Sequence, residues 1–299
     1  MKKIIIAIVV VVLLAVGVYY FINSSKSVTI IGDQNTASTT ADVNSTSTAP
    51  VNKEQTVIGK SVGGLDIMAY HFGTGTKEIL FIGGIHGGYE WNTALVAFQT
   101  MDYLKANPSV IPANLKVTVI PVLNPDGLVK VTGTSSKFTV ADVSKSDSVV
   151  VSGRFNGDTV DLNRNFDCDW QAEGKWQSKT VSGGTAAFSE PESQAIKAYV
   201  SANNPTAVVV WYSAAGGVFS SSCHNGVLAE TKALTNAFAK ASGYPAFEEF
   251  NFYEITGDMV NWLAKEKIPA ISVLLTNHTD TEWTKNLAGI KAVLKYYTE

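Results

Sequence analysis

Apolar and polar positions divide this chain into three parts: an apolar amino terminus, a polar segment, and a long stretch of alternating patterns. The first part, residues 4–22, has no charged side chain and follows Met1-Lys2-Lys3. As a helix it extends about 28 Å at ~1.5 Å per residue, close to the hydrocarbon thickness of a bilayer. It is longer than the apolar core of a usual signal peptide and lacks a clear small-x-small cleavage site. We therefore expect residues 1–22 to be an uncleaved signal-anchor, with a cleaved signal peptide as the alternative.

The second part, residues 23–56, is rich in Ser, Thr, Asn, Asp and Ala and contains no Phe, Tyr or Trp. Such a segment cannot bury enough apolar area to fold, so we expect a disordered tether. The lysines before the apolar run favour a cytoplasmic amino terminus. The predicted location is therefore a membrane-anchored chain whose folded domain, residues 57–299, lies outside the membrane on the extracytoplasmic side.

The third part alternates between strand-like and helix-like patterns. Two alternating runs around Gly63-Gly64 predict a hairpin within residues 56–73. Short apolar runs predict buried strands at 77–82, 115–123, 207–211 and 270–275, and helical spacings or capping signals predict helices at 90–104, 189–202, 227–241, 257–265 and 283–297. The second of these helices is expected to begin with a capping box, Ser189 to Glu192. This order predicts one α/β domain with a mixed, largely parallel central sheet and helices on both faces.

Composition excludes several classes of protein. The formal net charge of −3 gives no electrostatic footprint for a nucleic acid partner. Two cysteines without a CxxC pair exclude a disulfide-rich scaffold and argue against a structural zinc knuckle. Residues 130–188 are rich in Ser, Thr, Gly and Asp, and so long a loop region inside a compact domain is usually functional.

Candidate chemistry begins where the predicted strand 77–82 ends. The stretch Gly84-Ile-His86-Gly-Gly-Tyr-Glu90 forms a glycine-rich bend between that strand and a helix. Ligand sites of open α/β sheets gather at the carboxyl ends of the strands. An imidazole and a carboxylate placed there are a pair of ligands that zinc accepts.

Four separated stretches resemble one family, the zinc carboxypeptidases of the carboxypeptidase A type, over roughly residues 57–299. They are Gly84-Ile-His86-Gly-Gly-Tyr-Glu90-Trp91; Asn124-Pro-Asp-Gly127 with Val160-Asp-Leu-Asn163-Arg164-Asn-Phe166; Ser189-Glu-Pro-Glu-Ser-Gln194; and Tyr253-Glu-Ile-Thr-Gly257-Asp-Met-Val-Asn-Trp262, which leads into 270–276. The resemblance implies that His86 and Glu90 are the first two ligands of one Zn²⁺. It also implies that Arg154 stabilises the oxyanion that develops during peptide hydrolysis.

The same resemblance implies a peptide substrate with a free carboxyl end. Asn163 and Arg164 would hold that terminal carboxylate, and the planar guanidinium fork suits a carboxylate better than lysine does. Tyr253 would close over the substrate. Asp258 and Val260 fall in the region that lines the family's specificity pocket, and they do not decide between basic and apolar terminal residues.

The chain departs from the family pattern at three places. Three residues rather than two separate His86 from Glu90, and the flexible Gly87-Gly88 is expected to absorb the extra one. Tyr212 occupies the position of the third zinc ligand, where a phenol is a poor substitute for imidazole. Leu274 occupies the position of the general-base glutamate. His224 and His278 are alternatives for the missing ligand, although loop or surface positions are the more ordinary interpretation of both.

Three functions follow from these residues. The first is a zinc-dependent carboxypeptidase that removes carboxy-terminal residues, with cell-wall peptides as one candidate substrate class. The second is a catalytically impaired member that binds peptide carboxyl ends. The third, a serine hydrolase using Ser213 or Ser220, lacks a Gly-x-Ser-x-Gly elbow and a matched His/Asp set. The oligomeric state and the natural peptide stay open.

Cys168 and Cys223 are candidates for a disulfide. Both lie on the exported side in the topology predicted above, where an oxidising environment favours pairing.

Overall fold

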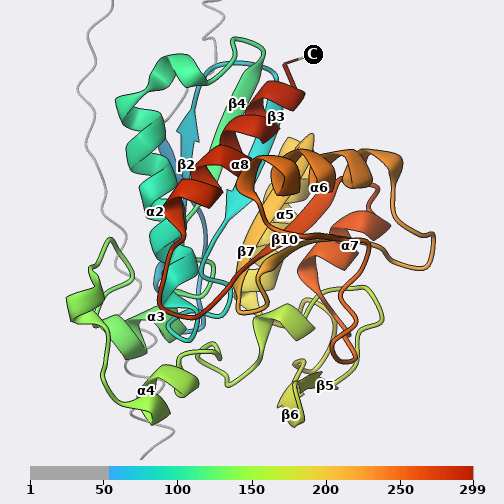
Figure 1. Ribbon diagram of the computed structural model, residues 1–299. Helices are drawn as coiled ribbons and strands as arrows, with labels where there is room; N and C mark the ends of the chain where they lie inside the picture. Colours follow the sequence, from blue (N-terminus) through green and yellow to red (C-terminus); the bar gives the residue numbers. More distant parts are fainter. Residues whose placement is uncertain (1–53, 299) are drawn as a thin grey trace, which may run out of the picture. The chain divides into compact units, whose positions relative to one another are not determined.

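The computed structural model describes residues 54–298 (Figure 1). The predicted signal-anchor, residues 1–22, and all but the end of the predicted tether lie outside the described residues. The first strand, β1, spans Gln55–Lys60, so the last two residues of the predicted tether belong to the sheet. Within residues 54–298, no helix combines the length and apolar character needed to cross a membrane.

A mixed eight-stranded sheet runs through the described domain in the order β1-β2-β4-β3-β7-β10-β8-β9. The remaining bounds are β2 (Asp66–Phe72), β3 (Lys77–Ile82), β4 (Leu115–Ile120), β7 (Ala207–Ser213), β8 (Gly217–Ser220), β9 (Ala246–Phe247) and β10 (Ala270–Leu275). The four central strands, β4, β3, β7 and β10, are parallel to one another, and antiparallel pairs join β2 and β8 to them. The predicted mixed, largely parallel sheet is confirmed.

Five helices cover the sheet: α2 (Trp91–Ala106), α5 (Pro191–Asn203), α6 (Ala229–Ser242), α7 (Met259–Lys265) and α8 (Trp283–Tyr296). Alternate residues of the central strands face opposite sides, as the period of a strand requires. On β3, Ile79 and Phe81 pack in the core shared with α2, α6 and α8, whereas Leu80 and Ile82 pack in the core shared with α5 and α7. Figure 1 shows α2, α6 and α8 together on the near face. The predicted helices on both faces are confirmed.

The loop-rich region contains several short elements. They are α3 (Pro125–Thr132), the 3₁₀ turn η2 (Val140–Asp142), α4 (Asp147–Ser152), the 3₁₀ turn η3 (Leu162–Arg164), and a separate hairpin of β5 (Glu173–Trp176) and β6 (Lys179–Ser182); a further turn, η1 (Pro108–Val110), follows α2. Asn124 caps α3 by accepting from Gly127 N at 2.8 Å. Of these elements, η3 and the β5–β6 hairpin lie at the carboxyl edge of the sheet, beside the ends of β7 and β10.

One local prediction is wrong. The capping box at Ser189 does not form, because the residue before α5 is Glu190 and no side chain caps the helix. Ser189 Oγ instead donates to Glu190 Oε1 at 2.7 Å. Glu192 accepts from Val62 N at 3.1 Å, so its carboxylate ties α5 to the loop after β1. The helix itself begins two residues later than expected.

Candidate functional site

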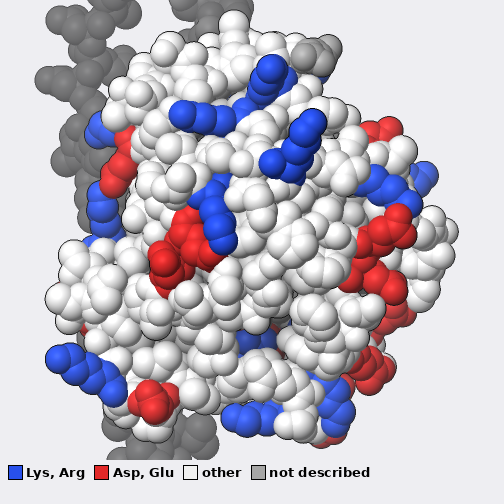
Figure 2. All heavy atoms as spheres, in the orientation of Figure 1, with Lys and Arg blue, Asp and Glu red and all other residues white. Residues whose placement is uncertain are grey.

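A cavity of 820 Å³ opens at the carboxyl ends of the central parallel strands. Its walls come from the β3–α2 turn, η3, the β5–β6 hairpin, the ends of β7 and β10, and the segment 249–255. Figure 2 shows a hollow in this face with basic atoms inside it, in a surface that is otherwise mostly uncharged. The predicted edge of the sheet therefore carries a concave, partly polar site.

His86 and Glu90 come together at the floor of this cavity. His86 Nδ1 lies 2.8 Å from Glu90 Oε1, and both side chains are buried. The contact lacks hydrogen-bond alignment, so His86 Nδ1 has no hydrogen-bond partner within the described residues. Glu90 Oε2 accepts from Ser213 N at 3.0 Å, which fixes the carboxylate against the end of β7. Two electron-pair donors thus converge without being bonded to each other.

The turn that holds His86 depends on the first of its two glycines. Gly87 has φ +45°, and a Cβ there would lie 2.6 Å from Gly153 O, so only glycine fits. Tyr89 follows the two glycines and lines the cavity. Its ring contacts the rings of Trp176 and His278, at centroid separations of 4.9 and 4.7 Å. Tyr89 is therefore part of the cavity wall.

Asp161 links the imidazole to a buried arginine. Asp161 Oδ1 lies 3.3 Å from His86 Nε2. Asp161 Oδ2 accepts from Arg154 Nε at 2.9 Å and lies 2.8 Å from Arg154 Nη2. The Arg154 guanidinium also lies 4.4 Å from the ring centre of Trp176. Burial alone raises the pKa of Asp161, but the positive charge of Arg154 and the contact with His86 outweigh it and hold the pKa well below its usual range. Asp161 is therefore an anion in the folded domain.

Tyr212 and Leu274 lie side by side at the ends of neighbouring strands. Strand pairing between β7 and β10 sets Leu274 directly opposite Tyr212. The Tyr212 hydroxyl donates to Asn163 Oδ1 at 3.2 Å. Burial, followed by the carboxylates of Asp258 and Glu90, raises the pKa of Tyr212 well above its ordinary value. The phenol therefore stays protonated, and its hydroxyl is a hydrogen-bond donor to Asn163 Oδ1.

Asn163 and Arg164 are already bonded within the domain, yet both keep free donors. Asn163 Nδ2 donates to Asp258 Oδ2 at 2.8 Å, which uses one of its two hydrogens. Arg164 donates through Nε and Nη2 to Lys175 O, at 2.9 and 2.6 Å, and through Nη1 to Asn163 O at 2.6 Å. Two of the five guanidinium hydrogens remain. Both residues line the cavity, and together they keep three N–H donors that no other residue of the described domain uses.

Tyr253 lies near Arg164 in the wall of the cavity. It belongs to the segment 249–255, and its ring centre lies 6.0 Å from the Arg164 guanidinium carbon. Burial raises the pKa of Tyr253, although the charges of Arg164 and Arg154 oppose the rise. Its hydroxyl is therefore a neutral donor near the arginines.

His278 enters the cavity from the loop after β10. Its Nδ1 lies 3.0 Å from Ser213 Oγ, and Ser213 Oγ donates to Asn92 Oδ1 at 3.1 Å. Asn92 Nδ2 donates to the carbonyls of Asn277 and Asp280, at 2.7 and 3.0 Å, so the amide cannot be flipped. Because the Ser213 hydroxyl already donates its proton to Asn92 Oδ1, it can only accept from His278. The His278 ring must therefore carry its proton on Nδ1 and donate it to Ser213 Oγ. Its Nε2 then carries a lone pair, and burial lowers the pKa of His278, which keeps the ring neutral.

Comparisons with known proteins agree on one family. The family model described as zinc carboxypeptidase matches residues 44–276, more than half of the chain. The chain belongs to the zinc carboxypeptidase family.

Several solved structures of this fold resemble the domain. Murein-tripeptide amidase MpaA from Escherichia coli O157 is 18% identical, with a TM-score of 0.56 over 80% of this chain and 90% of that chain. Carboxypeptidase A from Helicoverpa armigera is 19% identical, with a TM-score of 0.62 over 82% and 68%. Bovine thrombin-activatable fibrinolysis inhibitor, in complex with tick carboxypeptidase inhibitor, is 16% identical, with a TM-score of 0.63 over 82% and 88%. Identities this low show the fold alone. No curated protein sequence matches the chain.

The described domain offers two residues that suit the zinc of this family, but it does not offer a complete set of three ligands. His86 Nδ1 is a buried nitrogen without a hydrogen bond, 2.8 Å from Glu90 Oε1, which suits two ligands of one cation. The third position holds the protonated Tyr212. Within residues 54–298, ligand atoms of three or more His, Cys, Asp and Glu residues approach one another within 4.8 Å only around Cys168 and Cys223. The cavity therefore does not fit a three-ligand zinc site.

Most of the predicted site residues meet in the zinc carboxypeptidase cavity. It is lined by His86, Glu90, Arg154, Asn163, Arg164, Tyr212, Tyr253 and Leu274. Of the two alternative histidines, His278 is in the cavity wall, whereas His224 lies on the surface beside Asp169. Sequence reasoning missed Asp161, Trp176 and Asn92. Only Asp161 had a signal, since it stands two residues before Asn163 in the most specific of the four stretches.

Proposed function

We propose that this member of the zinc carboxypeptidase family binds the carboxyl end of a peptide and does not hydrolyse it. The observation that carries this proposal is the pair Tyr212 and Leu274, a protonated phenol and an apolar side chain at the two positions where the resemblance expects a zinc ligand and a general base.

The binding half of the site is supported by unused donors. Arg164 keeps two unused hydrogens and Asn163 keeps one, and both residues line the cavity. A charge-assisted bond from a guanidinium to a carboxylate is about twice as strong as a neutral one. Asp258 lies beside the same amide and accepts one of its hydrogens. Burial raises the pKa of Asp258, and hydrogen bonds from the Asn261 backbone and the Asn163 side chain oppose the rise. Tyr253 supplies a neutral hydroxyl above them.

The hydrolytic half of the site lacks its central groups. A positioned general base contributes roughly 10²–10⁴-fold to a hydrolytic rate. Leu274 has no group that accepts a proton, and Arg154, the implied oxyanion donor, is paired with Asp161. The peptide is therefore held at its end while its amide bonds stay intact.

Hydrolysis is kept as a second candidate because of one observation. The buried His86 Nδ1 lacks a hydrogen bond and faces Glu90. A zinc-dependent carboxypeptidase, acting on peptides such as those of cell walls, needs such a pair of ligands. We also propose, from the apolar run at residues 4–22, that the domain is tethered to a membrane and works on its outer side.

The experiment that separates the two candidates uses the full-length chain and an N-acetylated dipeptide. Calorimetry measures binding of the free acid and of the matched carboxy-terminal amide, and chromatography follows release of the terminal amino acid with added zinc. We expect the acid to bind, the amide to bind at least tenfold more weakly, and neither to be cleaved. Arg164→Lys should remove most of the difference. Release of the amino acid at about one zinc per chain supports the second candidate, and equal affinity for acid and amide contradicts both.

A further inference from the structure

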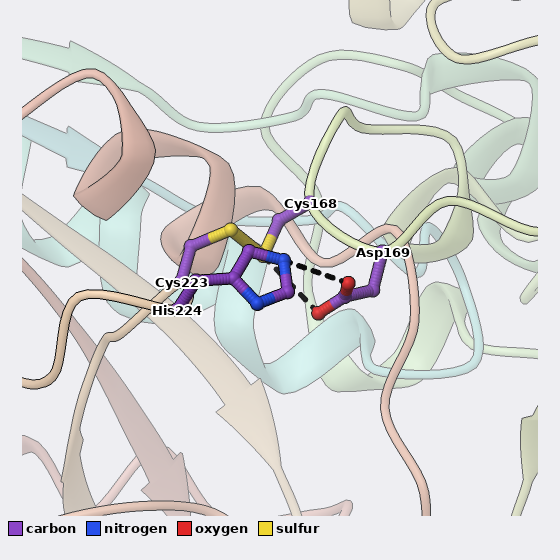
Figure 3. A group of neighbouring side chains, drawn as sticks. All are labelled: Cys168, Asp169, Cys223 and His224. Carbon is purple, nitrogen blue, oxygen red and sulfur yellow. Dashed lines mark hydrogen bonds and ion pairs between the residues drawn. A yellow bond between two sulfur atoms is a disulfide. The ribbon is translucent and has the colours of Figure 1, made fainter.

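A second group of metal-binding side chains surrounds the disulfide of the domain. Cys168 and Cys223 are bonded, with Cα atoms 6.1 Å apart, and they join the segment after η3 to the segment after β8. Figure 3 shows that the next residue after each cysteine points to the same place. His224 Nε2 lies 2.9 Å from Asp169 Oδ1, with side-chain exposures of 69% and 52%. The pair Cys168-Asp169 and the pair Cys223-His224, which come from segments far apart in the chain, thus lie together.

The backbone of both pairs brings the side chains together. Neighbouring residues in an extended chain point to opposite sides. Asp169 and His224 instead have φ values of +52° and +62°. A left-handed conformation is strained for a residue with a Cβ, and such residues gather at functional sites. Here it turns each side chain toward the sulfur of the residue before it.

The ligand atoms of these four residues all lie within 4.8 Å of one another. In a tetrahedral zinc site the ion lies roughly 2.3 Å from sulfur and about 2.0–2.1 Å from nitrogen or oxygen, so its ligands are on the order of 3.3–3.8 Å apart. Two sulfurs, an imidazole and a carboxylate are a set that zinc accepts and that calcium or magnesium does not favour. Because Asp169 and His224 are exposed, both can adjust without disturbing the core.

We propose that reduction of the disulfide converts this group into a zinc site with ligands Cys168, Asp169, Cys223 and His224. A dithiol reduces the S–S bond by exchange, gives its two protons to the cysteine sulfurs and is oxidised to its own disulfide. A phosphine supplies the two electrons instead, and one water molecule then supplies the two thiol protons and the oxygen of the phosphine oxide. Binding of Zn²⁺ then displaces the two thiol protons and forms two Zn–S bonds. The site lies outside the cavity and does not depend on the proposed function.

The consequence is that the same two segments stay joined in either redox state. Cys168 follows Asn163 and Arg164 in the chain, and its carbonyl accepts from Gly257 N at 2.8 Å. Cys223 follows Ser220 and Ser222, which line the cavity. A disulfide holds these walls under oxidising conditions, and a metal holds them under reducing conditions.

Cobalt binding to the reduced full-length chain tests the proposal. The protein is reduced with a phosphine, freed of reductant without air, and titrated with Co²⁺, which reports thiolate ligation by a charge-transfer band in the near ultraviolet. We expect one equivalent of Co²⁺ with tetrahedral visible bands, displaced by Zn²⁺, and no thiolate band in the oxidised chain. Cobalt bound at His86 and Glu90 gives no thiolate band, so the two sites are distinguished. Absence of this band from the reduced chain overturns the proposal.

Single substitutions then test the two ligands that are not cysteines. His224→Ala and Asp169→Asn should each weaken Co²⁺ binding at least tenfold. Asp167→Asn is the matched control, because Asp167 is an exposed carboxylate near Cys168 that pairs with Lys265 and lies outside the group. Its affinity should stay within twofold of the unsubstituted chain. Equal affinity in all three variants would mean that the thiolates bind the metal without His224 and Asp169, which contradicts the four-ligand site.

Discussion

At the scale of single residues, Tyr212 and Leu274 mark the boundary between binding and hydrolysis. We expect Tyr212→His to bring the zinc content to about one per chain, because it adds an imidazole beside His86 and Glu90. Peptide cleavage should appear only when Leu274→Glu is added, since that change restores a proton acceptor. Metal analysis and chromatography of an N-acetylated dipeptide check both steps. Tyr212→Phe is the control and should gain no zinc. A folded double variant that neither holds zinc nor cleaves peptide contradicts the assignment of both positions.

His278 offers a second prediction at this scale. The bonds of Asn92 and Ser213 require the His278 proton on Nδ1, so Nε2 is the unprotonated nitrogen. Nitrogen-15 NMR correlated with the ring protons should identify this tautomer near neutral pH. Ser213→Ala removes the acceptor for Nδ1–H and should shift the population toward the Nε2–H form. Finding Nε2–H in the unsubstituted chain would show that the polar chain runs in the opposite direction.

At the scale of elements, the β3–α2 turn depends on Gly87. We expect Gly87→Ala to destabilise the domain by about 1–3 kcal/mol or more, because a Cβ at φ +45° would lie 2.6 Å from Gly153 O. Gly133→Ala is the matched control: Gly133 also has a positive φ, +76°, but a Cβ there meets nothing within 4 Å. Its cost should be about 1 kcal/mol, from backbone conformation alone. Urea unfolding of both variants gives the comparison, and equal costs would show that the turn can open to admit a methyl group.

The loop between β10 and α8 contains Glu282, whose carboxyl makes the stability of the domain depend on pH. Burial acts to raise the pKa of Glu282, but hydrogen bonds from Lys285, Thr276 and Tyr244 lower it from 4.5 to about 2. A carboxyl whose pKa is lower in the folded state stabilises the fold above the unfolded value. This contribution is complete above pH 4.5 and is lost as the pH falls toward about 2. Glu282→Gln should therefore lower stability at neutral pH and flatten its loss in acid.

Urea unfolding at several pH values checks that expectation. Glu248→Gln is the control, because Glu248 also has a lowered pKa, through Lys232, but forms an exposed ion pair. Water and salt screen exposed pairs of this kind, so this pair contributes little to stability. If Glu282→Gln keeps the acid dependence of the unsubstituted chain, the bonds to Thr276 and Tyr244 do not hold the charged form.

At the scale of the whole molecule, the sequence predicted the layers of the fold better than the contacts of the site. Uniformly apolar runs such as 207–211 and 270–275 identify buried parallel strands, because both faces of these strands are covered. Nothing local predicted that His278 would reach the cavity. Its position follows from the bonds of Asn92 to the loop 277–280, a contact between residues far apart in the chain. The capping box predicted at Ser189 also fails because of a contact between residues far apart in the chain. The Glu192 carboxylate accepts a hydrogen bond from Val62 N instead of capping the helix.

Cross-linking acts on the stability of the entire domain, and it gives a last prediction. The disulfide Cys168–Cys223 closes a sequence separation of 55 residues. In the chain-entropy account, a loop of that length stabilises the fold by about 4 kcal/mol, because the crosslink restricts the unfolded chain. We expect the double variant Cys168→Ser, Cys223→Ser to lose about that much in urea unfolding, and its m-value to rise because a chain without the crosslink exposes more surface. Reduced unsubstituted chain in the presence of a chelator should behave in the same way. An unchanged midpoint and slope in both would mean that the segments after η3 and β8 are held by their packing alone, which leaves the disulfide without a part in the stability of the cavity.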